Sequence, residues 1–133
     1  MFDISKALLF IHSLNPPVLH WDIKPENIFI SEDLKAILGD FGIAKEYMLK
    51  NTQNLNTETC STLEYMSPET LNYSVYYKQS DIYSFGVLLF EVLTDKNYSE
   101  KQGFDFINEI VLKEYRPCLD LYEFDQRLKD LIK

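Results

Sequence analysis

The stretch HWDIKPENIFISEDLKAILGDFG, residues 20–42, contains two short apolar runs with charged and amide side chains before and after them. The runs are Ile28–Ile30 and Ala36–Leu38, and the polar residues between them predict a small β-hairpin. Antiparallel pairing brings the two ends of a hairpin together. We therefore expect Asn27, just before the first strand, to lie close to Asp40, shortly after the second.

Polar side chains at these two ends have the chemistry that phosphoryl transfer needs. Asn27 and Asp40 offer an amide oxygen and a carboxylate, which suit a magnesium ion that also binds phosphate oxygens. Asp22 can orient a hydroxyl group or accept its proton, and Lys24 can offset negative charge on a transferring group. Positioning and charge stabilisation are the main requirements of that reaction.

The sequence on both sides of the hairpin predicts helices. Apolar residues recur on one helical face over residues 4–14, before a pair of prolines ends the helix. Nearly every residue over 81–93 is apolar, which is typical of a buried helix. Two shorter amphipathic helices are predicted over 104–112 and 124–132. Residues 45–62 are polar and aperiodic, and we expect them to form a long loop.

The composition argues against several classes of protein. The 133 residues are 46% hydrophobic and carry a net charge of −8, which is compatible with one globular unit. This negative charge disfavours binding to nucleic acid, whose phosphates are neutralised by Lys and Arg, and binding to an anionic membrane surface. The longest apolar run, residues 85–90, is too short to span a bilayer. The spacing of the two cysteines matches neither a disulfide framework nor a zinc site, and the N-terminal segment lacks the basic region of a signal peptide. We therefore expect a cytoplasmic chain.

Four motifs in a fixed order connect the chain to a known family. They resemble the catalytic-loop, DFG, activation-segment and central-helix motifs of protein kinases, in the serine/threonine branch. The motifs are HWDIKPEN at 20–27, GDFG at 39–42, YMSPE at 65–69 and DIYSFG at 81–86. The resemblance covers essentially the whole chain, so residues 1–133 are identified as one kinase domain fragment.

The fold implied by this resemblance is the large, C-terminal lobe of a kinase. It is mainly α with a small β-hairpin, an α+β arrangement. No G-x-G-x-x-G motif occurs in the sequence, so we expect the family's small lobe, with its glycine-rich loop and strand lysine, to be missing. The implied segments are a catalytic loop at 18–27, a DFG motif at 40–42, an activation segment at 40–69 and a buried central helix at about 79–94.

The resemblance also implies roles for individual residues. Asp22 resembles the catalytic base, and Lys24 resembles the residue that steadies the γ-phosphate. Thr62 resembles the threonine that bridges to both of them in the serine/threonine branch. Asn27 and Asp40 resemble the magnesium ligands.

Further positions match residues that support the site in the family. Phe29 matches the position beneath the adenine, where leucine is usual. His20 and Phe41 are expected to be packed structural residues, and Glu69 resembles the acid that closes the activation segment. Asp81 resembles the buried acid that fixes the catalytic-loop backbone, although alone it would be read as a complement to a helix dipole.

Trp21 departs from the family pattern. An arginine usually precedes the catalytic aspartate and binds a phosphate on the activation loop by charge-assisted hydrogen bonds. Because indole has one N–H donor and no charge, we expect Trp21 to pack its ring against neighbouring side chains instead. The tyrosines Tyr73, Tyr76 and Tyr77, near the start of the central helix, are expected to be surface aromatics.

The activity implied by the resemblance is that of an ATP-dependent protein serine/threonine kinase. Such an enzyme uses ATP and Mg²⁺ to phosphorylate a protein hydroxyl, and neither nucleic acid nor a membrane is an expected partner. Without a small lobe, the chain is expected to be inactive on its own. The alternative is a free-standing kinase-like lobe that acts as a protein-binding module without catalysis.

Overall fold

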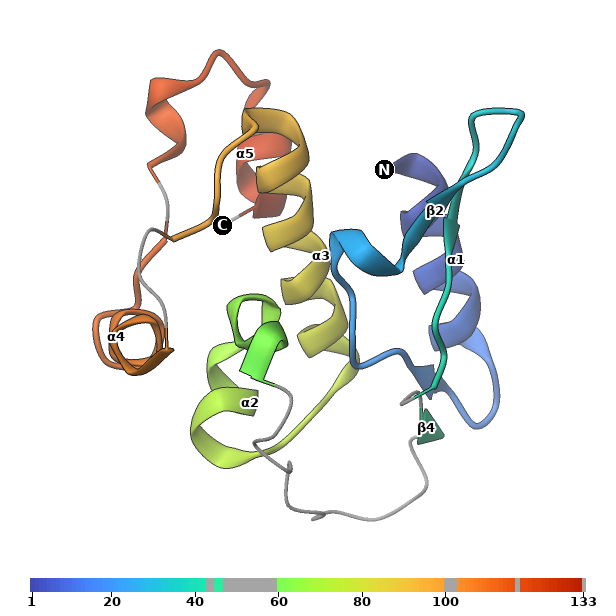
Figure 1. The fold of residues 1–133 in the computed structure, drawn as a ribbon, viewed down its shortest axis with the longest axis horizontal. Helices are drawn as coiled ribbons and strands as arrows, with labels where there is room; N and C mark the ends of the chain where they lie inside the picture. Colours follow the sequence, from blue (N-terminus) through green and yellow to red (C-terminus); the bar gives the residue numbers. More distant parts are fainter. Residues whose placement is uncertain (43–44, 47–59, 100–102, 117, 133) are drawn as a thin grey trace.

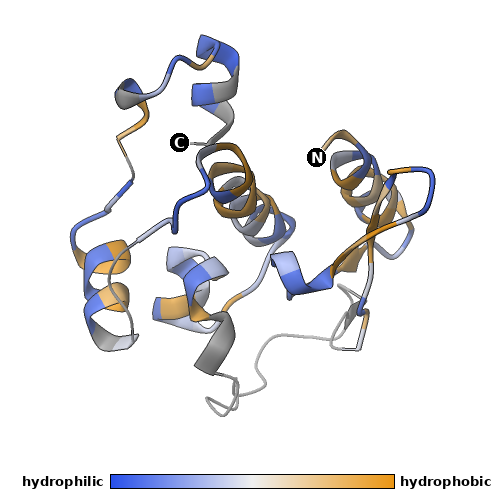
Figure 2. Ribbon diagram, turned by 45° about the horizontal axis from the view of Figure 1, so that its top comes forward, coloured by the Kyte–Doolittle hydropathy of each residue, from blue (hydrophilic) through white to orange (hydrophobic). Residues whose placement is uncertain are grey.

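Helix α3 (Lys78–Thr94) runs through the middle of the computed structural model, between the N-terminal and the C-terminal segments (Figure 1). The structure describes residues 1–42, 45–46, 60–99, 103–116 and 118–132. Every residue over 84–90 is buried, as expected for a helix that is apolar on nearly all sides (Figure 2). The rest of the chain therefore packs around α3.

The predicted hairpin is confirmed. Strand β2 (Ile28–Ile30) pairs antiparallel with β3 (Ala36–Leu38). Successive side chains of a strand point to opposite faces. One face of the hairpin packs against helix α1 (Phe2–Ser13), whereas Phe29 and Ile37 lie opposite each other on the other face and are 54% and 51% exposed.

Helix α1 buries most of the face that the sequence predicts. It contributes Ile4, Leu8 and Ile11 to the first hydrophobic cluster. Leu14 was expected on the same face but is 39% exposed, because the helix ends at Ser13 and the backbone of Leu14 is extended. The buried members of this cluster are Ile4, Leu8, Ile11, Ile23, Leu38, Phe85 and Leu88.

The prediction of one continuous loop over residues 45–62 is wrong at both ends. Strand β1 (Val18–Leu19) pairs antiparallel with β4 (Lys45–Glu46). Residues Cys60–Tyr65 form the 3-10 helix η2. A strand of two residues is too short to show an alternation of apolar and polar side chains, so the sequence pattern could not indicate β1 or β4. Residues 47–59 lie outside the described part of the chain.

The C-terminal half packs on the other side of α3 (Figure 1). The helix predicted over 104–112 starts as α4 (Gly103–Ile107) and continues as a π-helical turn, η3 (Asn108–Leu112). The helix predicted over 124–132 is α5 (Gln126–Ile132) and begins two residues later than expected. Before α3 lies α2 (Pro68–Tyr73), and between η3 and α5 lies the short 3-10 helix η4 (Leu119–Leu121).

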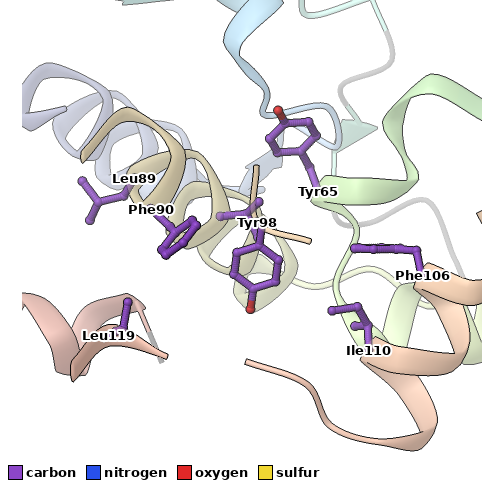
Figure 3. Close-up of a cluster of buried hydrophobic side chains, with 8 residues drawn as sticks. Tyr65, Leu89, Phe90, Tyr98, Phe106, Ile110 and Leu119 are labelled. Atoms are coloured by element: carbon purple, nitrogen blue, oxygen red, sulfur yellow. The ribbon is translucent and has the colours of Figure 1, made fainter. Parts of the chain in front are cut away.

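A second hydrophobic cluster joins η2, α4, η3 and η4 to α3 (Figure 3). Its buried members are Tyr65, Val87, Leu89, Phe90, Tyr98, Phe106, Ile110 and Leu119. Since Phe85 and Leu88 belong to the first cluster and Leu89 and Phe90 to the second, α3 is shared by both. This sharing explains why α3 has so few polar positions.

The described part of the chain is thus mainly helical with small two-stranded sheets, as the prediction of a mainly α fold with a small β-hairpin requires. None of the helices in the described residues combines the length and the apolar composition that a bilayer span requires.

Candidate active site

One buried carboxylate, that of Asp81, holds the backbone of the loop between β1 and the 3-10 helix η1 (Pro25–Asn27). Asp81 is fully buried, and its Oδ2 accepts a hydrogen bond of 2.9 Å from the backbone N–H of His20. Its Oδ1 accepts one of 3.0 Å from the backbone N–H of Trp21. The two residues that precede Asp22 are therefore tied to the start of α3.

Two side chains complete the hydrogen bonding of Asp81. Nε2 of His12, on α1, lies 2.7 Å from Oδ2, and the hydroxyl of Tyr76 donates to Oδ1 at 2.8 Å. An ionised carboxylate has about four acceptor positions, so each oxygen receives one backbone donor and one side-chain donor. A carboxylate buried in this way needs such partners, because an isolated charge is costly to bury.

The sequence prediction missed His12 and Tyr76. His12 is 69 positions from Asp81, and no local pattern indicates that contact. The expectation that Tyr76 is a surface aromatic is wrong, because its hydroxyl binds Asp81 and its ring stacks on that of Trp21. Burial and then the negative charge of Asp81 raise the pKa of Tyr76 well above its ordinary value, so its hydroxyl remains a donor.

The carboxylate of Asp22 is held by two neighbours from its own loop. Nζ of Lys24 lies 2.9 Å from Oδ2 of Asp22, and the two side chains are only 17% and 13% exposed. The amide nitrogen of Asn27 donates to the same oxygen at 2.9 Å and to the backbone carbonyl of Asp22 at 2.6 Å. These three residues, predicted from their spacing, therefore do lie together.

The ring of His20 links this loop to the GDFG segment. His20 is fully buried; its Nδ1 accepts a 3.3 Å hydrogen bond from the backbone N–H of Asp22, and its Nε2 lies 2.9 Å from the carbonyl oxygen of Gly39. Nε2 therefore carries the proton in this arrangement. The ring also meets Phe41 edge-on, with 4.8 Å between ring centroids.

The two ends of the hairpin meet as expected. The backbone N–H of Gly39 donates to the carbonyl of Asn27 at 2.9 Å, which continues the ladder beyond the paired strands. Asp40 follows directly, with a left-handed backbone (φ 54°), and its Oδ1 accepts a 3.1 Å hydrogen bond from the N–H of Gly42. Asp40 is exposed, and Asn27 is 5% exposed.

Phe29 lies against the backbone of the residue that precedes Asp40. A Cβ added to Gly39 would lie 2.5 Å from Cε2 of the Phe29 ring, which is closer than real contacts allow. Only glycine fits at position 39 while Phe29 keeps this position. The exposed side of Phe29 adds an apolar surface beside the polar groups.

The residues present fit the magnesium ion that the sequence implies. Because the nitrogen of the Asn27 amide binds Asp22, the amide oxygen is the atom that can face a cation. Asp40, at the adjoining end of the hairpin, adds a carboxylate. Both are hard oxygen donors, which magnesium prefers, and one or two such ligands are typical when phosphates supply the rest.

Glu69 and Thr62, which were expected in the activation segment, belong to α2 and η2, and both helices precede α3 in the chain. Glu69 is partly exposed, and its Oε1 accepts a 2.8 Å hydrogen bond from the hydroxyl of Ser80 at the start of α3. It also borders an open pocket of about 540 Å³ together with Arg116. The side chain of Thr62 lies outside the part of the molecule that the structure describes.

The carboxyl group of Glu64 lies under the influence of two other glutamates. Burial, and then the negative charges of Glu91 and Glu26, raise the pKa of Glu64 above its ordinary value. Glu91, on α3, accepts a 2.7 Å hydrogen bond from the hydroxyl of Tyr65. Since Glu26 is in η1 and Glu64 in η2, a negative region spans the two segments.

Comparison with known proteins places this arrangement in a family. The model of the protein kinase domain matches residues 1–133. A putative leucine-rich repeat receptor-like serine/threonine-protein kinase of Arabidopsis thaliana is 39% identical over 93 residues, which cover 69% of this chain and 11% of that protein.

Two further relatives come from distant organisms. The probable serine/threonine-protein kinase gdt2 of Dictyostelium discoideum is 39% identical over 140 residues, or 99% of this chain and 8% of that protein. A putative serine/threonine-protein kinase/receptor of Acanthamoeba polyphaga mimivirus is 34% identical over 117 residues, or 88% of this chain and 7% of that protein. The chain thus spans about a tenth of the length of these relatives. It belongs to the protein kinase family.

Proposed function

We propose that the chain is the large, catalytic lobe of an ATP-dependent protein serine/threonine kinase, which transfers the γ-phosphate of ATP to a protein hydroxyl. One observation carries this proposal: the carboxylate of Asp22 is fixed by Lys24 and Asn27, while Asp81 holds the backbone just before it. Phosphoryl transfer depends on such positioning and on charge stabilisation.

Asp22 is the proposed general base. It is placed to orient the substrate hydroxyl and to accept its proton as the phosphate is transferred. Lys24, whose ammonium group is 2.9 Å from Asp22, is close enough to offset negative charge on the transferring group. Its contact with Asp22 also keeps the carboxylate in one orientation.

Asn27 and Asp40 are the proposed magnesium ligands. The bound ion would neutralise charge on the phosphates of ATP. Asn27 is oriented by Asp22, and Asp40 by the N–H of Gly42. The exposed side of Phe29 is the proposed apolar surface beneath the adenine.

On its own, the 133-residue chain is proposed to be inactive. Its sequence has no G-x-G-x-x-G motif to cover the phosphates. The exposed pair Phe29 and Ile37 is also compatible with the alternative function, a non-catalytic lobe that binds other proteins. An experiment must therefore separate catalysis from binding.

The test uses a two-lobed protein, in which the small lobe of a related kinase is joined to the N-terminal side of residues 1–133. We expect it to transfer radiolabel from γ-labelled ATP to serine or threonine of a general protein substrate, and the chain alone to transfer none. Asp40→Asn should reduce the rate at least about 10²-fold by weakening the metal site. Asp33→Asn, at an exposed position in the hairpin turn, is the matched control.

Label on tyrosine alone would contradict the proposed specificity. A folded two-lobed protein that transfers no label would contradict catalysis and favour the protein-binding alternative. An Asp40→Asn variant as active as the Asp33→Asn control would contradict the proposed metal site.

A further inference from the structure

Tyr76 contacts the loop that carries Asp22 in two ways. Its ring stacks on the indole of Trp21, with 5.0 Å between ring centroids and 28° between ring planes. Its hydroxyl donates to Oδ1 of Asp81, the same oxygen that accepts the backbone N–H of Trp21. Tyr76 lies between α2 and α3, so the contact brings a distant segment of the chain against the residue next to Asp22.

The backbone of Trp21 needs such support. Its φ angle is 72°, in the left-handed region that a residue with a Cβ seldom adopts. A conformation of this kind persists only when the surroundings impose it. Asp81 holds the N–H of Trp21, and Tyr76 holds its ring, so backbone and side chain are both fixed.

The direction of Asp22 depends on this conformation. Asp22 follows Trp21 directly, and a change in the backbone angles of Trp21 would rotate the Cα–Cβ bond of Asp22 relative to Lys24 and Asn27. Both of those residues contact the Asp22 carboxylate at 2.9 Å. A shift of the loop would therefore disturb both contacts.

We propose that Tyr76 is a positioning residue for phosphoryl transfer: by stacking on Trp21 it holds the left-handed backbone that aims the carboxylate of Asp22. The inference rests on the proposed kinase function. Tyr76 touches neither substrate nor nucleotide in this role and acts through Trp21.

The kinetic arm of the test uses the two-lobed protein. Tyr76→Leu removes the stacked ring, and we expect kcat to fall roughly ten- to a hundredfold, because misplacing reacting groups by about 1 Å costs up to about 10²-fold. The KM for ATP should not change, since the nucleotide does not contact Tyr76. Tyr76→Phe keeps the ring and should retain most of the activity. Tyr73→Leu, which replaces a tyrosine that is 71% exposed, should match the parent.

The spectroscopic arm uses the 133-residue chain. Trp21 is its single tryptophan, so the fluorescence of the chain reports on the stack directly. Tyr76→Leu should shift the emission to longer wavelength and make Trp21 more accessible to acrylamide. Tyr76→Phe and Tyr73→Leu should leave both properties as in the parent.

If Tyr76→Leu folds poorly, Trp21→Leu alone replaces it, because this variant removes the same stack and should lower kcat in the same way. Where both variants fold, a double-mutant cycle tests their coupling. Trp21→Leu removes the other half of the stack, and its effect on kcat should be far from additive with that of Tyr76→Leu, because residues in contact are coupled. Additive effects would overturn the inference. So would unchanged fluorescence in folded Tyr76→Leu, or an unchanged kcat in that variant beside an active parent. A parent without phosphoryl transfer would instead overturn the proposed function, and this inference with it.

Discussion

At the scale of single residues, Asp81 anchors the loop that carries Asp22. It receives hydrogen bonds from two backbone amides and two side chains although it is fully buried. The sequence predicts its contact with the loop through the family resemblance. It does not predict which side chains complete the arrangement, because His12 and Tyr76 reach Asp81 only through the tertiary fold.

Replacing Asp81 with Asn should destabilise the chain. The NH₂ group of the new amide would face one of the donors that now bind an oxygen of Asp81. That donor would lose its acceptor, and each buried donor left unsatisfied costs about 1–3 kcal/mol. The free energy of unfolding, measured with urea, should fall by at least that amount. Asp33→Asn, an exchange of the same kind at an exposed site, should change it little. Equal stabilities of the two variants would contradict the assigned role of Asp81.

Gly39 and Phe29 should behave as a coupled pair. Gly39→Ala places a Cβ 2.5 Å from the Phe29 ring and should cost about 1–3 kcal/mol, as overpacking usually does. In a chain that already has Phe29→Ala, the same exchange should cost much less, because the clashing ring is gone. Thermal unfolding of the two single variants and the double variant measures this coupling. A cost of Gly39→Ala that does not depend on Phe29 would show that the ring lies elsewhere.

The raised pKa of Glu64 predicts how the stability of the folded chain depends on pH. Its pKa is raised in the folded state by burial and by Glu91 and Glu26, so the ionised form opposes folding. The stability linked to this group is fully present below the unfolded pKa, near 4.5, and is lost as the pH rises through the folded value. Glu64→Gln should therefore raise Tm at pH 7 but not at pH 4.

The control for this experiment is Glu32→Gln, at an exposed position in the hairpin turn. It should change Tm little at either pH. If Glu64→Gln lowered Tm at pH 7, the ionised form of Glu64 would not oppose folding as its raised pKa indicates.

At the scale of secondary structure, the hairpin and α3 could be predicted because each has a strong local signal. Two apolar runs of three residues flank a polar turn, and the two strands pair antiparallel as a hairpin requires. Helix α3 contains a stretch over 81–93 in which nearly every residue is apolar, and this stretch is longer than most strands. The β1–β4 pair could not be predicted, because two residues carry no period and their partners are far apart in sequence. The change from α4 to the π-helical η3 has no signal in the apolar pattern of residues 104–112 either.

Two neighbouring leucines test the orientation of α1. Leu8 is 2% exposed and belongs to the first hydrophobic cluster, whereas Leu9 is 72% exposed. Leu8→Ala should lower the free energy of unfolding by about 2–5 kcal/mol, the usual cost of such a cavity. Leu9→Ala should change it by less than about 0.5 kcal/mol. Similar losses in both variants, measured by urea denaturation, would contradict the packing of α1.

At the scale of the whole molecule, one helix connects the hydrophobic core to the candidate site. Helix α3 joins both hydrophobic clusters, and its first turns present Asp81 to the loop that carries Asp22. The spacing of residues 20–42 was enough to predict the neighbours Asp22, Lys24 and Asn27, because they lie on one short loop. The sequence could not indicate which of Tyr73, Tyr76 and Tyr77 faces this loop.

The measurement that tests the central claim most directly is a single-turnover phosphoryl transfer assay of Asp22→Asn in the two-lobed protein. Loss of the general base should reduce the rate at least about 10²-fold. The Asp33→Asn control should transfer phosphate at the parental rate. A folded Asp22→Asn protein that transfers phosphate as fast as this control would contradict the account.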